Sequence, residues 1–228
     1  MNKQDSSDPV LELNYSSWLP QDLRAAILDL GCGDGRMLRF LSGKGYLNIH
    51  GVDRDPVALA EIGKLEGVAV ECTEVGLEYL RQQRGKFKLI ILKQMIYYVE
   101  RSEIMPFMLA LKDALTDDGV IVVEFFNAAL LSSRMTELKD PFIRTAYTEH
   151  SMRRLFAATG LHELHIGGEH RKNEKKLRSH IYSALRASWM SLLKAIYILE
   201  RGFDNELPQI YTKSIIAVAG KRPIRIPI

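Results

Sequence analysis

The chain has 228 residues, of which 46% are hydrophobic and 26% charged, and its formal net charge is +3. This composition is typical of one folded globular domain and excludes a disordered or fibrous chain, while the small charge gives no strong indication of a nucleic-acid partner. The two cysteines, Cys32 and Cys72, exclude a disulfide framework and a zinc centre of cysteines and histidines, so we expect no metal site.

The N-terminal residues 1–14 read as a polar lead-in, without the charged, apolar and small-residue order of a secretion signal. The sequence contains no run of about eighteen apolar residues, so we expect no transmembrane segment. These features predict a cytoplasmic protein.

Strand-like and helix-like segments then alternate along the chain. Strands are predicted from apolar runs at 25–30, 48–53, 67–72, 87–92 and 119–126. Helices are predicted from the amphipathic segments at 36–45, 56–65, 76–83 and 103–115. A longer connection, a further helix and a sixth strand follow at 127–147, 148–160 and 161–166. Buried strands alternating with helices are typical of a parallel sheet covered on both faces, so the predicted fold class is α/β.

The C-terminal part departs from this alternation. Residues 169–211 contain a charged run and a predicted helix at about 180–201, and a last strand follows at 212–220. Because no regular crossover helix joins the final two strands, we expect the last one to be antiparallel to its neighbours. The sequence therefore predicts a single domain, 1–228, with a helical insertion at about 169–211.

The first strand leads into the glycine-rich sequence DLGCGDG at 29–35 and then into a helix. Glycines at alternate positions allow backbone conformations that side chains forbid, and they let a ligand lie against the chain. A dinucleotide fingerprint counted from Gly31 would place Arg36 at its sixth position, where a small residue is needed. The loop also lacks the lysine and following serine or threonine of a P-loop. The pattern therefore favours a different cofactor.

The stretch ILDLGCGDGRMLRFL at 27–41 resembles motif I of the class I S-adenosylmethionine-dependent methyltransferases. The resemblance continues through GVDRDPVALA, FKLIILKQMIYYV and LKDALTDDGVIVVEFFN, and it covers roughly residues 23–168 plus the last strand. It implies a Rossmann-like, seven-stranded, mostly parallel sheet flanked by helices, with the last strand antiparallel. It also implies S-adenosylmethionine as the cofactor.

The resemblance implies which residues of this sequence bind the cofactor. Asp53, at the end of the second strand, matches a carboxylate that accepts hydrogen bonds from both ribose hydroxyls. Glu74 matches the acidic position that faces the adenine amino group, although the nearby Glu71 leaves the register open. Lys93 and Gln94 follow the fourth strand, where the family places contacts near the methionine and the transferred methyl group. The predicted set is Asp29, Gly31, Cys32, Gly33, Asp53, Arg54, Glu74, Lys93 and Gln94.

Three candidate catalytic residues lie beyond the carboxyl ends of the later strands. His150 has the side chain best suited to act as a general base near neutral pH; alternatively, Thr148 caps the following helix and His150 is an exposed first-turn residue. Tyr97 and Tyr98 occupy positions where related sequences frequently carry histidines, and they form either a wall of the acceptor pocket or part of the core.

The acceptor is predicted partly from what the sequence lacks. After the fourth strand it has KQMI instead of the N/D-P-P-Y/F element of base-modifying methyltransferases. This favours a small-molecule or glycan acceptor, methylated at oxygen, and the C-terminal helix and strand resemble methyltransferases of bacterial surface-glycan pathways. Two alternatives stay open: a regulatory protein that binds S-adenosylmethionine without transferring methyl, and an RNA methyltransferase.

The predicted helix at 180–201 carries an apolar stripe, which consists of Ile181, Leu185, Trp189, Leu192, Leu193, Ile196 and Leu199. Such a stripe is typical of the core or of a homodimer interface; a pocket lid and a membrane-surface contact are the other interpretations. The preceding basic run at 171–178 suits a phosphate or uronate, or is solvated surface.

Overall fold

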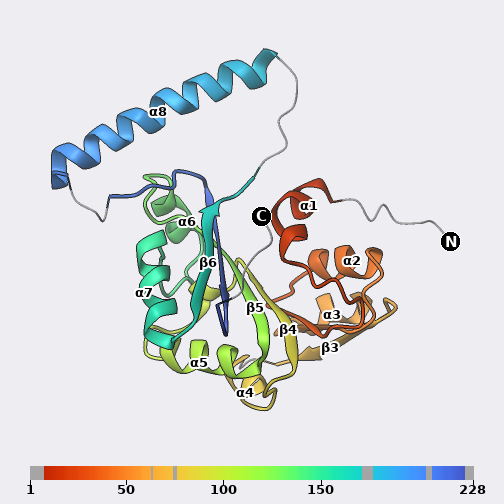
Figure 1. Cartoon of the computed structure of the whole chain (residues 1–228). Coiled ribbons are helices and arrows are strands. Elements are labelled where there is room, and N and C mark those ends of the chain that lie inside the picture. Colours follow the sequence, from red (N-terminus) through yellow and green to blue (C-terminus); the bar gives the residue numbers. More distant parts are fainter. Residues whose placement is uncertain (1–7, 63, 74–75, 171–176, 204–206, 224–228) are drawn as a thin grey trace.

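The computed structural model describes residues 8–62, 64–73, 76–170, 177–203 and 207–223, and a seven-stranded sheet lies at its centre (Figure 1). Across the sheet the strands follow the order β3-β2-β1-β4-β5-β7-β6. They are β1 (Ile27–Leu30), β2 (Ile49–Asp53), β3 (Val68–Cys72), β4 (Phe87–Lys93), β5 (Leu115–Phe126), β6 (His162–Gly168) and β7 (Ser214–Gly220).

Strand pairing is parallel from β3 through β5, whereas β7 runs antiparallel to both β5 and β6. This confirms the predicted α/β class, the mostly parallel sheet and the antiparallel last strand. The strand order reverses between β1 and β4, because the chain builds one half of the sheet before it crosses to the other. Ligands of open α/β sheets bind at such a reversal, outside the carboxyl ends of the strands.

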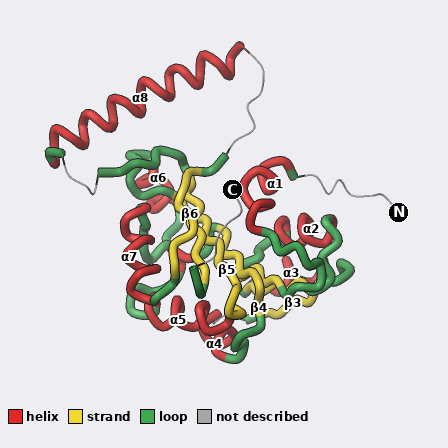
Figure 2. The backbone as a smooth tube through the Cα atoms, in the orientation of Figure 1, coloured by secondary structure: helices red, strands yellow, loops and turns green. Residues whose placement is uncertain are grey.

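Helices cover both faces of the sheet (Figure 2). Side chains of α1, α2 and α3 share one core with the sheet, and side chains of α4, α5 and α7 share the other. The helices are α1 (Pro9–Tyr15), α2 (Arg36–Gly43), α3 (Pro56–Ile62), α4 (Gly76–Arg81), α5 (Ile104–Ala114), α6 (Ser133–Lys139), α7 (Glu149–Thr159) and α8 (Leu177–Arg201), and 3-10 turns occur at Ser16–Trp18 and Ile96–Tyr98.

Successive residues of a strand supply the two cores in alternation. In β4, Leu89 and Ile91 belong to the core with α2. Their neighbours Ile90 and Leu92 belong to the core with α5. Since strand side chains alternate between faces and both faces are covered, the strand is apolar along its length. Asp29 of β1 breaks this pattern, because it is a carboxylate only 1% exposed to solvent.

The N-terminal helix α1 corrects the prediction of a polar lead-in over residues 1–14. Asp8 caps the helix by accepting hydrogen bonds from two backbone N–H groups of its first turn. Leu11 and Tyr15, one turn apart, are buried in the same core as α2. A seven-residue helix is too short to show a clear 3.6-residue periodicity, so its local signals are the capping residue Asp8 and Pro9 at the first helical position.

Helix α8 lies outside the two helix layers, near the end of the molecule that carries α6 (Figure 1). Among the described side chains of the predicted stripe, Leu193 is buried, and the exposed ones are Leu185, Trp189, Leu192, Ile196 and Leu199; the side chain of Ile181 lies outside the described part. The residues of α8 that line a cavity against the body or bond to it are Arg186, Trp189, Met190, Leu193 and Tyr197. Among the described residues of the stripe, the core interpretation therefore holds for Leu193 alone and is wrong for the exposed ones.

Candidate functional site

The loop between β1 and α2 is folded back onto the end of β2. The backbone N–H groups of Gly31 and Cys32 both donate to the carbonyl of Val52, at 2.7 and 3.1 Å. Gly31, Gly33 and Gly35 all have positive φ angles, of 80°, 50° and 74°. L-residues rarely adopt this conformation, so the alternate glycines of the sequence are required by the backbone itself.

The three glycines differ in what surrounds them. A Cβ atom on Gly31 would lie 2.6 Å from Cγ of Met95, and one on Gly35 would lie 2.5 Å from Cδ1 of Ile62. A Cβ on Gly33 would meet no protein atom within 4 Å. Gly31 and Gly35 therefore allow close packing inside the protein, whereas Gly33 borders an open space that a ligand can occupy.

Asp53, the last residue of β2, lies directly against this loop. Its Oδ2 accepts a hydrogen bond of 2.7 Å from the backbone N–H of Gly33, and its Oδ1 accepts one of 3.1 Å from Asp55. A carboxylate can accept about four hydrogen bonds, so Asp53 keeps acceptor sites for two hydroxyl groups of a ligand.

Asp29 adds a second, buried carboxylate. Among the described residues its Oδ1 has no hydrogen-bond partner. Burial raises the pKa of Asp29 to about 7; the nearby Lys93 ammonium opposes this shift, and Asp53 adds to it. An unpartnered buried carboxylate oxygen is costly, and a ligand that presents a cationic donor would satisfy it. The buried acid, the open space and Asp53 fit the methionyl and ribose parts of S-adenosylmethionine.

Gln94, directly after β4, is the one non-glycine residue with positive φ, 56°, in the described part of the chain. Its backbone N–H donates to the Glu124 carbonyl at 2.8 Å, and its Nε2 donates to Glu124 Oε1 at 2.7 Å. Tyr15 of α1 donates its hydroxyl to the same carboxylate. Such a conformation costs about 1–3 kcal/mol and often marks a functional position, so these contacts hold Gln94 in place.

The tyrosine pair that follows β4 forms a wall of hydrogen-bond donors. Tyr97 is buried and donates to Gln94 Oε1 at 3.1 Å, while Tyr98 is 40% exposed and donates to Asp140 at 2.7 Å. Burial raises the pKa of both phenols, and the hydrogen bond to Asp140 adds to the rise for Tyr98. Both tyrosines are therefore neutral near pH 7.

Arg54 connects the end of β2 with the segment after α6. Its guanidinium lies 5.7 Å from the centre of the Phe142 ring, which is within the range of a cation–π contact. The backbone N–H groups of Arg144 and Thr145 donate to the carbonyl of Tyr97, at 2.8 and 3.2 Å. The segment around Phe142 thus bridges β2 and β4 beyond their carboxyl ends.

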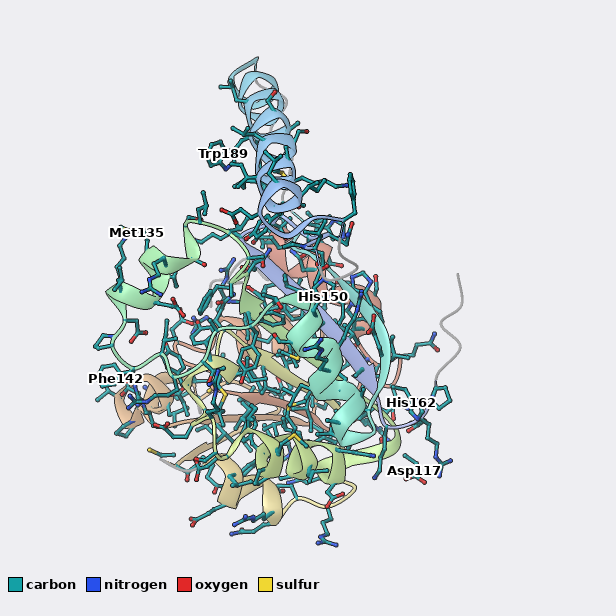
Figure 3. The ribbon with its side chains drawn as sticks, turned by 90° about the vertical axis from the view of Figure 1, so that its left-hand side faces the viewer. Asp117, Met135, Phe142, His150, His162 and Trp189 are labelled. Atoms are coloured by element: carbon teal, nitrogen blue, oxygen red, sulfur yellow. The ribbon has the colours of Figure 1, made fainter. Side chains whose placement is uncertain are left out.

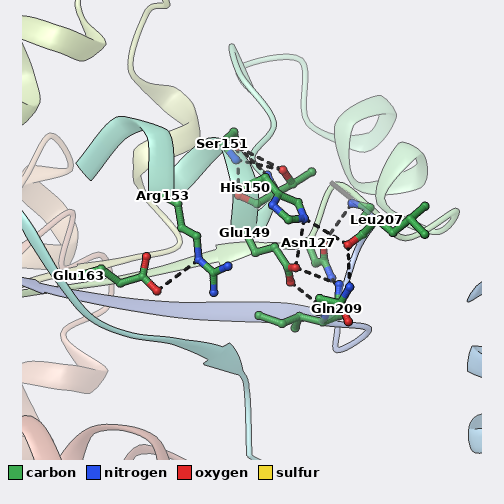
Figure 4. A network of polar contacts seen from close by, with 11 residues as sticks. Asn127, Glu149, His150, Ser151, Arg153, Glu163, Leu207 and Gln209 are labelled. Carbon is green, nitrogen blue, oxygen red and sulfur yellow. Dashed lines mark hydrogen bonds and ion pairs between the residues drawn. The ribbon is translucent and has the colours of Figure 1, made fainter. Parts of the chain in front are cut away.

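His150 belongs to a different network of contacts, in the first turn of α7 (Figure 4). Thr148 caps this helix, as predicted by the alternative in which His150 is an exposed first-turn residue. The His150 side chain, however, is only 22% exposed. Its Nε2 lies 3.2 Å from the carbonyl of Leu207 and 3.4 Å from Glu149. Glu149 is buried and accepts backbone hydrogen bonds of 2.9 Å from Gln209 and its neighbour. This network ties α7 to the segment before β7.

Two further predicted positions complete the comparison with the sequence. Cys32 is buried, and burial raises the pKa of its thiol, so it is neutral in the loop and has no nucleophilic character. Glu74 lies outside the described residues. The structure also adds residues that the sequence analysis did not select, since Tyr15 and Phe142 reach the site only through tertiary contacts.

The model of the methyltransferase domain family matches residues 8–166. No curated protein matches the sequence. Similar solved structures include S-adenosylmethionine-dependent methyltransferases from Archaeoglobus fulgidus (14% identity, 86% of each chain, TM-score 0.63) and Mesorhizobium loti (16% identity, 90% of this chain and 94% of that chain, TM-score 0.62). Another is the 1,6-didemethyltoxoflavin-N1-methyltransferase of Burkholderia thailandensis (13% identity, 88% and 72% coverage, TM-score 0.56).

These structural similarities show the fold, and the family model, which spans the glycine-rich loop and most of the sheet, shows the family. In the described part of the chain, no helix combines the length and apolar character needed to cross a membrane. Because the family model matches residues 8–166, the chain belongs to the methyltransferase domain family and is a methyltransferase that uses S-adenosylmethionine as its cofactor.

Proposed function

We propose that the protein transfers the methyl group of S-adenosylmethionine to an oxygen atom of a small-molecule or glycan acceptor. In this proposal residues 1–228 form one methyltransferase domain, and the insertion at 169–211 serves the acceptor. The observation that carries the proposal is the open space over Gly33, which Asp53 adjoins, together with the buried Asp29 near Asp53.

The residues around this open space are assigned to parts of the cofactor. Asp53 accepts hydrogen bonds from the ribose hydroxyls, and Asp29 offers its unpaired oxygen to the ammonium group of the methionyl part. Gly31, Cys32 and Gly33 supply the loop backbone. Three further residues border the site, Arg54 at the end of β2 and Lys93 with Gln94 at the end of β4. Glu74, which lies outside the described residues, is assigned to the adenine.

The methyl group of a sulfonium is already activated, so the chain must align the acceptor and, for a hydroxyl, take up its proton. Tyr97 and Tyr98 stay protonated, and because their O–H groups already donate to Gln94 and Asp140, they are assigned to position the acceptor as an aromatic wall. His150 is assigned to accept the proton: with Nε2–H donating to the Leu207 carbonyl, Nδ1 is left as an acceptor.

The size of the available cavities supports a small acceptor. Two cavities of about 530 and 210 Å³ lie near the carboxyl end of β5, and a third of about 420 Å³ is lined by His150. Such volumes suit small molecules or single sugar units. The Burkholderia thailandensis protein, which is similar in fold, methylates a small molecule at nitrogen, so the acceptor atom needs its own test.

Radiolabelled S-adenosylmethionine, incubated with the protein and a cell extract, tests the acceptor class. We expect label in the small-molecule or glycan fraction, on an oxygen atom once the product is analysed by mass spectrometry. Label confined to RNA, or no transfer by a protein that binds S-adenosylhomocysteine, would contradict the proposal. The first result favours an RNA methyltransferase and the second a regulatory protein.

The role of His150 is tested separately with the labelled acceptor. His150→Gln keeps the size and polarity of the side chain but removes the base, so kcat should fall by about 10²–10⁴ with unchanged S-adenosylhomocysteine affinity. A variant with the parent kcat would assign His150 to the network around Glu149 alone.

A further inference from the structure

Two adjoining cavities lie between α8 and the carboxyl end of β5. The larger, of about 530 Å³, extends under α8, and the smaller, of about 210 Å³, extends to Phe126. Both are lined by Leu130, Ser132 and Lys213, so they form one groove, which we call the α8 groove. Figure 3 shows Trp189 of α8 and Met135 of α6, one from each cavity, on the same side of the molecule.

The charges along the α8 groove have one sign. Arg186 and Lys213 line the larger cavity, Lys139 and Lys213 line the smaller one, and neither wall contains an aspartate or glutamate. Within the described part of the chain none of these three cations has a carboxylate partner. In a chain whose net charge is only +3, this concentration of unpaired positive charge favours an anionic ligand.

Tyr211, from the segment before β7, also lines the larger cavity. Tyr211 is 9% exposed, and its hydroxyl has no hydrogen-bond partner among the described residues. A buried hydroxyl without a partner is unfavourable, but this oxygen is closed off from solvent, so Tyr211 contributes only as a residue of the cavity wall.

The rest of the larger cavity is apolar. Trp189, Met190 and Leu193 of α8 face Leu130 and Leu131 from the segment before α6. Trp189 is half exposed, so part of its ring is available to a ligand. Apolar walls with a few polar groups are typical of ligand sites, and here they suit the apolar or aromatic part of the same ligand.

The inner end of the α8 groove reaches the acceptor side of the proposed active site. Phe126 lines the smaller cavity, and its ring centre lies 5.0 Å from that of Tyr97. Tyr97 in turn donates to Gln94, which follows β4 beside the glycine-rich loop of β1. A molecule lying along the groove therefore extends toward the cofactor.

We propose that the α8 groove is the binding site for the acceptor and that this acceptor is an amphipathic anion. Its carboxylate or phosphate is held by Arg186 and Lys213, its apolar part packs on Trp189, and its remaining end points toward Phe126. This inference rests on the proposed function, whose acceptor class it narrows.

A fluorescence titration tests the site without methyl transfer. Trp18→Phe leaves Trp189 as the one tryptophan of the chain, and it therefore reports on the larger cavity. In this background we expect saturable binding of monomeric dodecyl phosphate or dodecanoate, and at least tenfold weaker binding of dodecanol. Arg186→Met and Lys213→Met should each weaken binding of the anionic probe by about tenfold or more.

Lys194→Met is the matched control, because Lys194 lies on α8, is exposed and lines neither cavity. It should leave probe affinity unchanged, and circular dichroism should show that all variants keep their helix content. Equal binding of dodecanol and dodecyl phosphate, or equal losses in Lys194→Met and Arg186→Met, would overturn the proposal. So would binding only to phosphatidylglycerol vesicles, which would make α8 a membrane contact.

S-adenosylhomocysteine affinity, measured by calorimetry on the same variants, separates the two proposals. Normal affinity with lost probe binding supports the α8 groove as a distinct acceptor site. A parent protein that binds the probe but not S-adenosylhomocysteine contradicts the proposed function and leaves the anion site standing.

Discussion

The backbone N–H of Gly33 donates a hydrogen bond of 2.7 Å to the carboxylate of Asp53, and this contact joins the glycine-rich loop to the end of β2. A second hydrogen bond, from Asp55, holds the other carboxylate oxygen. The carboxylate is thus oriented by the protein before it meets a ligand, which reduces the entropy lost on binding.

Asp53→Ala should weaken S-adenosylhomocysteine binding by about 1.5 to 3 kcal/mol, since it removes charged hydrogen bonds to the ribose. Asp53→Asn is the control for the loop, because its amide oxygen can still accept from Gly33 while the charge is lost. Calorimetry of both variants checks this. Parent affinity in a folded Asp53→Ala protein would remove Asp53 from the site.

A comparison of Gly33→Ala with Gly31→Ala should separate the effect of the loop on cofactor binding from its effect on the free energy of unfolding. At Gly33 a Cβ meets open space and the strain of positive φ costs about 1 kcal/mol, so binding should fall much more than stability. At Gly31 the Cβ meets Met95, and the free energy of unfolding should fall by about 2 to 4 kcal/mol. Urea denaturation and calorimetry measure the two effects. Unchanged cofactor affinity in Gly33→Ala would show that the open space is not the cofactor site.

Asp29→Asn should change the pH dependence of stability in the ligand-free protein. Because burial raises the pKa of Asp29 to about 7, the folded state holds a proton that the unfolded state releases near pH 4. The stability that this proton contributes is present below pH 4 and is lost as the pH rises to 7. Asp29→Asn should therefore gain stability relative to the parent over this range, by at most about 4 kcal/mol at 1.36 kcal/mol per pKa unit. Thermal unfolding from pH 4.5 to 8 checks this, and a constant difference would contradict it.

Asn14→Ala should destabilise the protein, because Asn14 joins α1 to the end of β6. Its Nδ2 donates to the His170 carbonyl at 2.9 Å, and its Oδ1 accepts from the His170 N–H at 2.7 Å. Unpaired buried groups cost about 1–3 kcal/mol, so urea denaturation should show a loss of that size. Leu13→Ala, at an exposed position of the same helix, should change stability by less than about 0.5 kcal/mol. Equal effects would contradict the role of Asn14.

The sheet and the glycine-rich loop are predictable from the sequence because their signals are local. Continuous apolar runs mark strands buried on both faces, and the spacing of Gly31, Gly33 and Gly35 reflects positive φ angles at alternate residues. Asp53 follows from its place at the end of the second run. The glycine-rich loop and Asp53 can therefore be predicted from the order of residues along the chain.

The rest of the candidate site is not predictable in this way, since its contacts join distant parts of the chain. Tyr15 reaches Glu124 across 109 positions, and the inward face of α8 is set in part by a hydrogen bond from Tyr197 to the Ala129 carbonyl. The apolar stripe of α8 has the right periodicity but gives no information on which side meets the body. Only the tertiary contacts decide that.

The most direct test of the account is calorimetric titration of the purified protein with S-adenosylhomocysteine and, separately, with NAD. The alternate glycines, the buried Asp29 and the carboxylate of Asp53 predict saturable one-site binding of S-adenosylhomocysteine and no measurable binding of NAD. Tight binding of NAD without binding of S-adenosylhomocysteine would contradict it.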